Sequence, residues 1–211
     1  MAAGLGRSGI ELAKIYGAQV TLTDMDASRL ERAKQFAIKD RVSDLVSVKE
    51  LDMFNIGSVF GDAKFDVAQT EASLTHYPRS QKAKFFQGVA NHADKFILHE
   101  VYLKTDDAAR QDIAKKDLSK ALNVGFAPET ADMWQQLLTD AGFQLDHVNT
   151  GDLAVLDPLS IIKDEGMLGF AKIIFNVATH PYLRSRMLRT KRVMEKHADD
   201  LGYITIVASK K

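Results

Sequence analysis

Apolar residues follow two alternating patterns along the chain, short β-branched runs and longer stretches with helical spacing. The short runs predict strands at residues 18–23, 45–51, 64–69, 95–103, 143–148 and 203–208. The stretches between them predict helices at residues 8–16, 26–37, 79–92, 105–120 and 128–138. Strands that alternate with helices indicate an α/β fold, in which helices cover both faces of a mostly parallel sheet.

The apolar runs also predict which side chains are buried. In the third expected strand, Phe65, Val67 and Ala68 are expected to face the core. In the fourth, His99 lies among apolar residues, so we expect a histidine packed in the core with a hydrogen-bond partner.

A long helical stretch separates the last two expected strands. We expect a helix that contains Gly169 and a basic helix at residues 181–197 to form a hairpin over the sheet edge. A chain of 211 residues suits one domain. Residues 151–201 are therefore expected to be a helical insertion within a single domain, 1–211.

A glycine-rich segment stands at the start of this pattern. The spacing Gly4-x-Gly6-x-x-Gly9 precedes a helix, and Asp24 ends the strand that follows. Glycines allow a ligand to approach the backbone, and an acid about 20 residues further on suits the hydroxyls of a ribose. This stretch predicts a site for a nucleoside-containing cofactor, although glycines that serve only a tight turn would give the same spacing.

Composition and charge narrow the function. Lysine and arginine number 28, as do aspartate and glutamate, and this balance argues against a nucleic-acid partner. The basic run at residues 184–192 is expected to be a solvated helix face. The chain has no cysteine, which excludes disulfides and thiolate chemistry and fits a cytoplasmic protein. The histidines share no ligand spacing, so we expect no metal, and no run of about 20 apolar residues predicts a membrane span.

The glycine segment follows Met1 directly, although such a loop normally follows a buried strand. We therefore expect that the chain lacks its first strand, either as a fragment or because its start is set wrongly. The absence of a central strand would expose the edges of both neighbouring strands. Such a chain could be inert, or it could pair with another copy of itself as a homodimer.

Several motifs, taken in order, are similar to those of one enzyme family. The run from Ala2 to Gly6 matches the later part of a glycine motif, and Asp24 and Asp52 each follow a strand. Phe65-Asp66-Val67-Ala68, then Leu74 to Tyr77, resembles an "FDVV" strand and the "LHH" that follows it. The ending at residues 203–210 is similar to a final antiparallel strand. Together these motifs resemble class I S-adenosylmethionine-dependent methyltransferases that act on small molecules, which have a Rossmann-like fold.

The resemblance implies a set of site residues. Asp24 would hold the ribose hydroxyls, and Asp52 with Met53 would border the adenine. The implied cofactor-binding residues are Ala2, Ala3, Gly4, Gly6, Asp24, Met25, Asp52, Met53 and Thr70. Residues 157–200 would cover the site and influence the choice of acceptor.

The acceptor side of the site is less defined. Glu71, His76 and Tyr77 follow the strand at 64–69, where open α/β sheets bind ligands, and are the candidate catalytic residues. Any of them could orient an acceptor or remove its proton, as could His99 and Glu100 in the strand at 95–103, although a base is needed only if the acceptor must lose a proton. His76 could instead cap a helix, and Glu100 could pair with a nearby lysine or arginine.

Three functions remain open from the residues. The first is an S-adenosylmethionine-dependent methyltransferase with an unidentified small-molecule acceptor. The second is an NAD(P)-dependent oxidoreductase with a dinucleotide site, which the glycine spacing also fits, although no second substrate domain is evident. The third is a truncated, non-catalytic relative of the methyltransferases.

Overall fold

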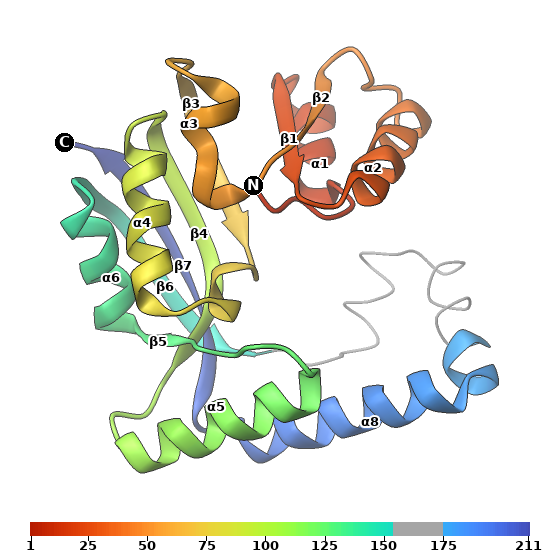
Figure 1. The fold of residues 1–211 in the computed structure, drawn as a ribbon, viewed down its shortest axis with the longest axis vertical. Helices are drawn as coiled ribbons and strands as arrows, with labels where there is room; N and C mark the ends of the chain where they lie inside the picture. The colour runs from red at the N-terminus through yellow and green to blue at the C-terminus, as the bar shows by residue number, and fades with distance from the viewer. Residues whose placement is uncertain (154–174) are drawn as a thin grey trace.

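The computed structural model describes residues 1–153 and 175–211 (Figure 1). The helices are α1 (Arg7–Tyr16), α2 (Ala27–Lys39), α3 (Ile56–Phe60), α4 (Arg79–Ala90), α5 (Ala108–Leu122), α6 (Ala131–Asp140) and α8 (Pro181–Lys196), with short 3-10 helices η1 (Met53–Asn55) and η2 (Leu74–His76). The strands are β1 (Val20–Asp24), β2 (Val46–Glu50), β3 (Phe65–Glu71), β4 (Ala93–Leu103), β5 (Glu129–Thr130), β6 (Phe143–Asp152) and β7 (Leu201–Lys210). Every strand and helix that the sequence predicts within these residues is present, with shifted ends.

The strands form two sheets. β1 and β2 pair in parallel, and a five-stranded sheet has the order β3-β4-β7-β6, with β5 beside β4. β3 and β4 are parallel, whereas β7 lies antiparallel between β4 and β6. This arrangement confirms the α/β, Rossmann-like fold with an antiparallel last strand.

The first residues of the chain lie between the two sheets (Figure 1). The Ala3 amide donates to the Thr23 carbonyl of β1 at 2.8 Å, and the Thr70 hydroxyl of β3 donates to the Met1 carbonyl at 3.3 Å. Ala2 packs against the core of the five-stranded sheet and Ala3 against the core of the β1–β2 sheet. Residues 1–3 therefore connect β1 to β3 at the ends of these strands.

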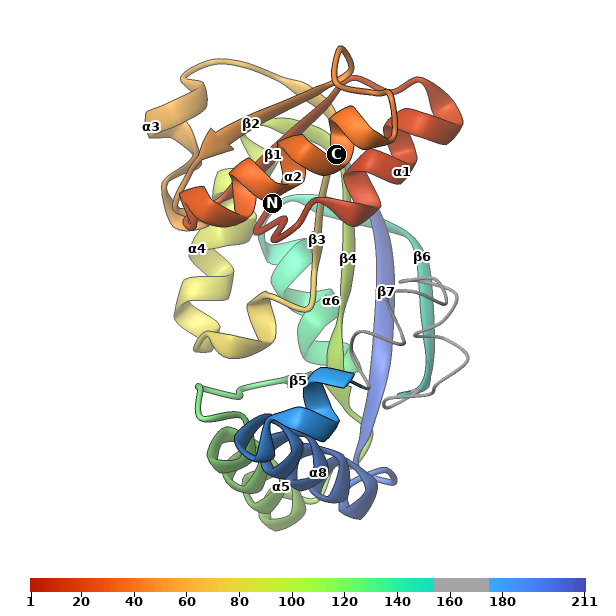
Figure 2. The same cartoon turned by 90° about the vertical axis from the view of Figure 1, so that its right-hand side faces the viewer.

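Each sheet has its own apolar core. Ile10 and Ala13 of α1 and Ala33 of α2 pack around Leu22 of β1. On the larger sheet, α4 and α6 cover one face (Figure 2). In the core of the larger sheet, the Phe86 ring meets the rings of Phe96 and Trp134 at angles near perpendicular, an arrangement that aromatic pairs favour.

The opposite face of the larger sheet corrects two predictions about burial. Val67 is 48% exposed, and His99 is also exposed, where its Nδ1 lies 2.7 Å from the Thr205 hydroxyl. Parallel pairing places Val67 beside Lys95, and residues 95 and 99 share one strand face. Because α4 and α6 pack on the other face, where Phe96 is fully buried, the expected core positions of Val67 and His99 are wrong.

The helical insertion is described only in part. α8 lies beside α5 (Figures 1 and 2), where Asp117 of α5 accepts hydrogen bonds from Lys196 and His197. The basic side chains at 184–192 are exposed, which confirms the predicted solvated face. The expected helix around Gly169 lies outside the described residues, so the predicted hairpin with it stays a prediction.

Candidate functional site

The three glycines of the loop, Gly4, Gly6 and Gly9, have different surroundings. A Cβ on Gly6 would lie 2.4 Å from a Leu22 methyl group, and one on Gly9 would lie 2.5 Å from the other. Glycine at these positions therefore allows α1 to pack closely on β1. Gly4 instead has a φ of +54° and no atom within 4 Å of its would-be Cβ, so its backbone borders open space.

Asp24 ends β1 beside this loop. Its carboxylate is largely buried, at 8% residue exposure, and accepts hydrogen bonds from the Gly4 amide at 2.8 Å and the Asp26 amide at 3.0 Å. Gly6 is the N-cap of α1, and no side-chain hydrogen bond caps the first turn of this helix. The open space at Gly4, the uncapped helix and the adjacent acid together fit the ribose and its neighbouring polar groups in a nucleoside cofactor.

The predicted adenine side lies at the end of β2. Since β1 and β2 are parallel and pair Asp24 with Glu50, Asp52 follows at the same edge of the sheet as Asp24. The Asp52 side chain is exposed and accepts a hydrogen bond from the Phe54 amide at 3.0 Å. The Met53 side chain lies in the core, and Met25 is 62% exposed.

Two residues at the end of β3 link it to the loop. Thr70 is buried, and its hydroxyl contacts both the Met1 carbonyl and the Ser73 hydroxyl. The exposed Glu71 accepts a hydrogen bond from the Ser8 hydroxyl at 2.8 Å. Glu71 therefore ties the start of α1 to β3, a contact that the sequence did not reveal because 63 residues separate the partners.

His76 is the last residue of η2, and Tyr77 follows it. His76 Nδ1 lies 2.9 Å from the Gly125 carbonyl oxygen, which can only accept, so Nδ1 carries the proton. In the neutral ring, Nε2 is then unprotonated and able to accept a proton. The Tyr77 ring meets the Phe54 ring edge to face at 4.7 Å, which brings η2 next to η1. The ends of β1, β2 and β3 thus meet at one site.

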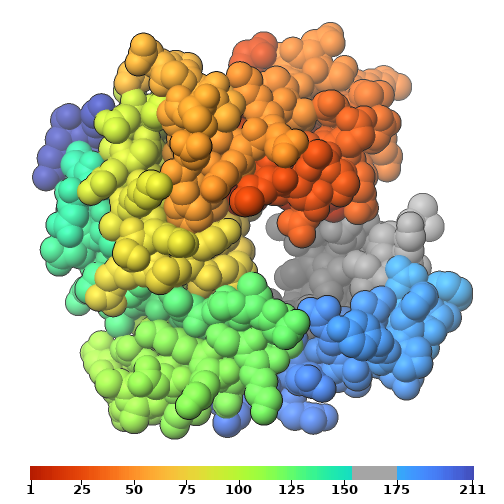
Figure 3. All heavy atoms as spheres, viewed as in Figure 1, coloured from red at the N-terminus to blue at the C-terminus, as the bar shows by residue number. Residues whose placement is uncertain are grey.

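The molecular surface is hollowed next to these residues. Figure 3 shows an opening between the red N-terminal residues and the yellow segment after β3 on one side and the green residues of α5 and the segment after it on the other.

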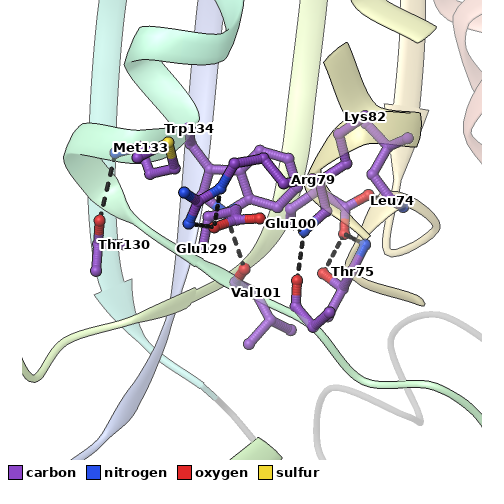
Figure 4. Close-up of polar contacts among 11 residues, drawn as sticks. Leu74, Thr75, Arg79, Lys82, Glu100, Val101, Glu129, Thr130, Met133 and Trp134 are labelled. Atoms are coloured by element: carbon purple, nitrogen blue, oxygen red, sulfur yellow. Dashed lines mark hydrogen bonds and ion pairs between the residues drawn. The ribbon is translucent and has the colours of Figure 1, made fainter. Parts of the chain in front are cut away.

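Glu100 has partners that the sequence did not predict. Its carboxylate accepts hydrogen bonds from Ser73, Leu74 and Thr75 (Figure 4), and it forms no ion pair with a described lysine or arginine. The alternative in which Glu100 pairs with a nearby lysine or arginine is therefore not observed, and Lys82 and Arg79 bind Glu129.

Two further searches cover only the described parts of the chain. Within residues 1–153 and 175–211, His, Asp and Glu residues form no group of three or more that could hold a metal ion. No helix in these same ranges is long and apolar enough to span a membrane.

Comparisons with known proteins show what this chain is similar to. Residues 1–95 match the family model described as "Methyltransferase domain". An uncharacterized protein of Haemophilus influenzae is 28% identical over 214 residues, which cover all of this chain and 82% of that protein. These matches include the glycine loop, Asp24 and the residues that follow β3.

Solved structures share the fold. A candidate sarcosine dimethylglycine methyltransferase from Galdieria sulphuraria has a TM-score of 0.74 at 14% identity, with 99% of this chain and 76% of that chain covered. An S-adenosylmethionine-dependent methyltransferase from Thiobacillus denitrificans, in complex with S-adenosylhomocysteine, has a TM-score of 0.68 at 14% identity, with 100% and 83% covered. The resemblance to class I S-adenosylmethionine-dependent methyltransferases is confirmed, and the expected cofactor agrees with the ligand bound in the second structure.

Proposed function

We propose that this protein is a methyltransferase that uses S-adenosylmethionine to methylate a small-molecule acceptor. The observation that carries the proposal is the buried Asp24 carboxylate, which lies 2.8 Å from the Gly4 amide at the edge where β1, β2 and β3 end. A carboxylate beside an open glycine loop suits a ribose with two free hydroxyls.

The chain's own residues would divide the binding task. Ala2, Ala3, Gly4 and Gly6 supply the backbone surface, Asp24 accepts hydrogen bonds from the ribose, and Asp52 borders the base. Thr70 supports this surface from β3 through the Met1 carbonyl. The cofactor supplies a methyl group on a sulfonium, which reacts when a nucleophile is held in line with it.

His76 is the proposed base for an acceptor that must lose a proton. Its Nδ1 proton is held by the Gly125 carbonyl, so the neutral ring offers Nε2 for proton transfer. Tyr77 would orient the acceptor from the same turn. Glu71 already accepts from Ser8, so we assign it to holding the loop rather than to proton transfer.

A small molecule is the proposed acceptor class. The chain has equal numbers of basic and acidic residues, and the Galdieria protein with a similar fold is named for sarcosine and dimethylglycine, which are small amines. The solved structures named above are methyltransferases, which favours a methyltransferase over the oxidoreductase alternative. The other alternative is a protein that keeps the fold but catalyses no methyl transfer. The experiment below distinguishes that protein from the proposed enzyme.

The test is transfer of a labelled methyl group. The protein is incubated with methyl-labelled S-adenosylmethionine and either a low-molecular-weight filtrate or the heat-treated macromolecules of a cell extract. We expect label in a small molecule, with none when Asp24→Ala replaces the wild type. Label that appears only in macromolecules would overturn the acceptor class, and no transfer to either fraction would favour a non-catalytic protein.

A further inference from the structure

Glu100 is a buried acid whose oxygens all point at one turn. It lies on β4, is 2% exposed, and faces the segment that begins η2 (Figure 4). One oxygen accepts from the Ser73 amide at 2.8 Å and the Leu74 amide at 2.7 Å. The other accepts from the Thr75 amide at 3.2 Å and the Thr75 hydroxyl at 2.6 Å.

The carboxylate of Glu100 holds this turn more strongly than a neutral acceptor would. Hydrogen bonds to a charged acceptor are about twice as strong as those between neutral groups. Burial makes a carboxylate costly unless donors satisfy it, and here the donors come from three consecutive residues. The backbone at 73–75 is therefore fixed to β4 rather than free to follow its own loop conformation.

The same turn is held from its other side by the segment after α5. The Ala127 amide donates to the Thr75 carbonyl at 2.7 Å, and the Gly125 carbonyl holds the His76 ring. A Cβ on Gly125 would lie 3.0 Å from the His76 carbonyl oxygen, so the two segments are in close contact.

A buried lysine keeps that second segment in place. Lys82 of α4 is fully buried and donates to the Ala127 carbonyl and to Glu129. Burial lowers the pKa of Lys82 below its usual value, and the hydrogen bond with Glu129 only partly offsets this effect. The Lys82 ammonium lies 4.7 Å from the centre of the Trp134 ring. The segment at 125–129 is thus anchored independently of Glu100.

We infer that Glu100 is a positioning residue, which holds the turn at 73–75 so that His76 and Tyr77 face the cofactor and acceptor. The inference deepens the proposed function and rests on it. Ser73 also contacts Thr70, whose hydroxyl supports the Met1 carbonyl, so movement of this turn would reach the glycine loop as well.

The test compares variants at both ends of the hydrogen bonds. Glu100→Gln keeps the shape of the side chain but replaces one acceptor oxygen with an NH2 group, which cannot accept the hydrogen bonds of the turn. Thr75→Val removes only the hydroxyl, and Thr75→Ser restores it. Trp134→Phe is the control for general destabilisation, since it removes the indole hydrogen bond to the Val101 carbonyl, keeps an aromatic ring beside Lys82, and changes no hydrogen bond of the turn.

Two measurements distinguish positioning from a structural role alone. NMR of the His76 ring nitrogens reports its tautomer, and calorimetry reports S-adenosylhomocysteine affinity. In Glu100→Gln we expect the single Nδ1–H tautomer to be lost and affinity to fall about tenfold. Thr75→Val should lose about threefold, whereas Thr75→Ser and Trp134→Phe should keep the wild-type tautomer and affinity.

The outcomes separate this inference from the proposed function. If folded Glu100→Gln keeps the wild-type tautomer and affinity, the inference is overturned, and an equal loss in Trp134→Phe would overturn it too. If Glu100→Gln does not fold, the difference between Thr75→Val and Thr75→Ser decides. If wild type does not bind S-adenosylhomocysteine, the proposed function fails, and the His76 tautomer still decides whether Glu100 positions the turn.

Discussion

Removal of the Asp24 carboxylate should weaken cofactor binding far more than it weakens the fold. A carboxylate has about four acceptor positions, and the Gly4 and Asp26 amides occupy only part of them. The remaining positions can accept both ribose hydroxyls. A hydrogen bond to a charged group contributes about 1.5–3 kcal/mol, so two of them contribute about 3 kcal/mol or more.

This energy sets the expected loss of affinity. Since about 1.4 kcal/mol corresponds to a factor of ten, Asp24→Ala should weaken S-adenosylhomocysteine binding about 100-fold or more. Asp24→Asn keeps one acceptor oxygen and should lose about tenfold. Isothermal titration calorimetry measures both values, and circular dichroism establishes that each variant is folded.

Asp26→Ala is the matched control for this experiment. Asp26 lies two residues away and caps α2 through the Ser28 and Arg29 amides. Its loss should lower the free energy of unfolding by about 1 kcal/mol and leave affinity unchanged. Wild-type affinity in folded Asp24→Ala, or an equal loss in Asp26→Ala, would refute the assignment of Asp24 to the ribose.

Two further predictions concern the loop and the buried ion pair. Gly4→Ala should abolish S-adenosylhomocysteine binding in calorimetry yet cost only about 1 kcal/mol of stability, because its φ is positive but its surroundings are open. Gly6→Ala should lower the melting temperature much further, since its Cβ would collide with Leu22, and comparable melting temperatures would contradict this reasoning. Glu129→Gln leaves Lys82 buried without a carboxylate and should cost about 3 kcal/mol in urea unfolding at pH 7. Burial raises the pKa of Glu129, but its bonds from Arg79 and Lys82 lower it below the ordinary 4.5, so the difference from wild type should shrink as pH falls below 4.5 and should not grow.

The positions of the elements followed from local sequence. Periodicity located the strands and helices because a strand buried on one or both faces and a helix buried on one face have different apolar spacings. Asp24 could be predicted for the same reason, since a loop, a helix and a strand of ordinary length fix its distance from Gly4 along the chain. Both residues lie at the candidate site, where the Gly4 amide nitrogen is 2.8 Å from a carboxylate oxygen of Asp24.

Contacts between distant segments could not be predicted in this way. The burial of Val67 and His99 depends on which face of the sheet α4 and α6 cover, and apolar neighbours in the strand do not reveal that face. Glu100 reaches Thr75 across 25 residues, and His76 reaches Gly125 across 49. A carboxylate with only backbone and hydroxyl partners leaves no charge pattern in the sequence to find.

The most direct test of the account is a calorimetric titration of the wild-type protein with S-adenosylhomocysteine, with NAD as the comparison ligand. We predict saturable binding of S-adenosylhomocysteine at one site and no binding of NAD. Binding of NAD alone, or of neither ligand by a protein with a folded circular-dichroism spectrum, would contradict it.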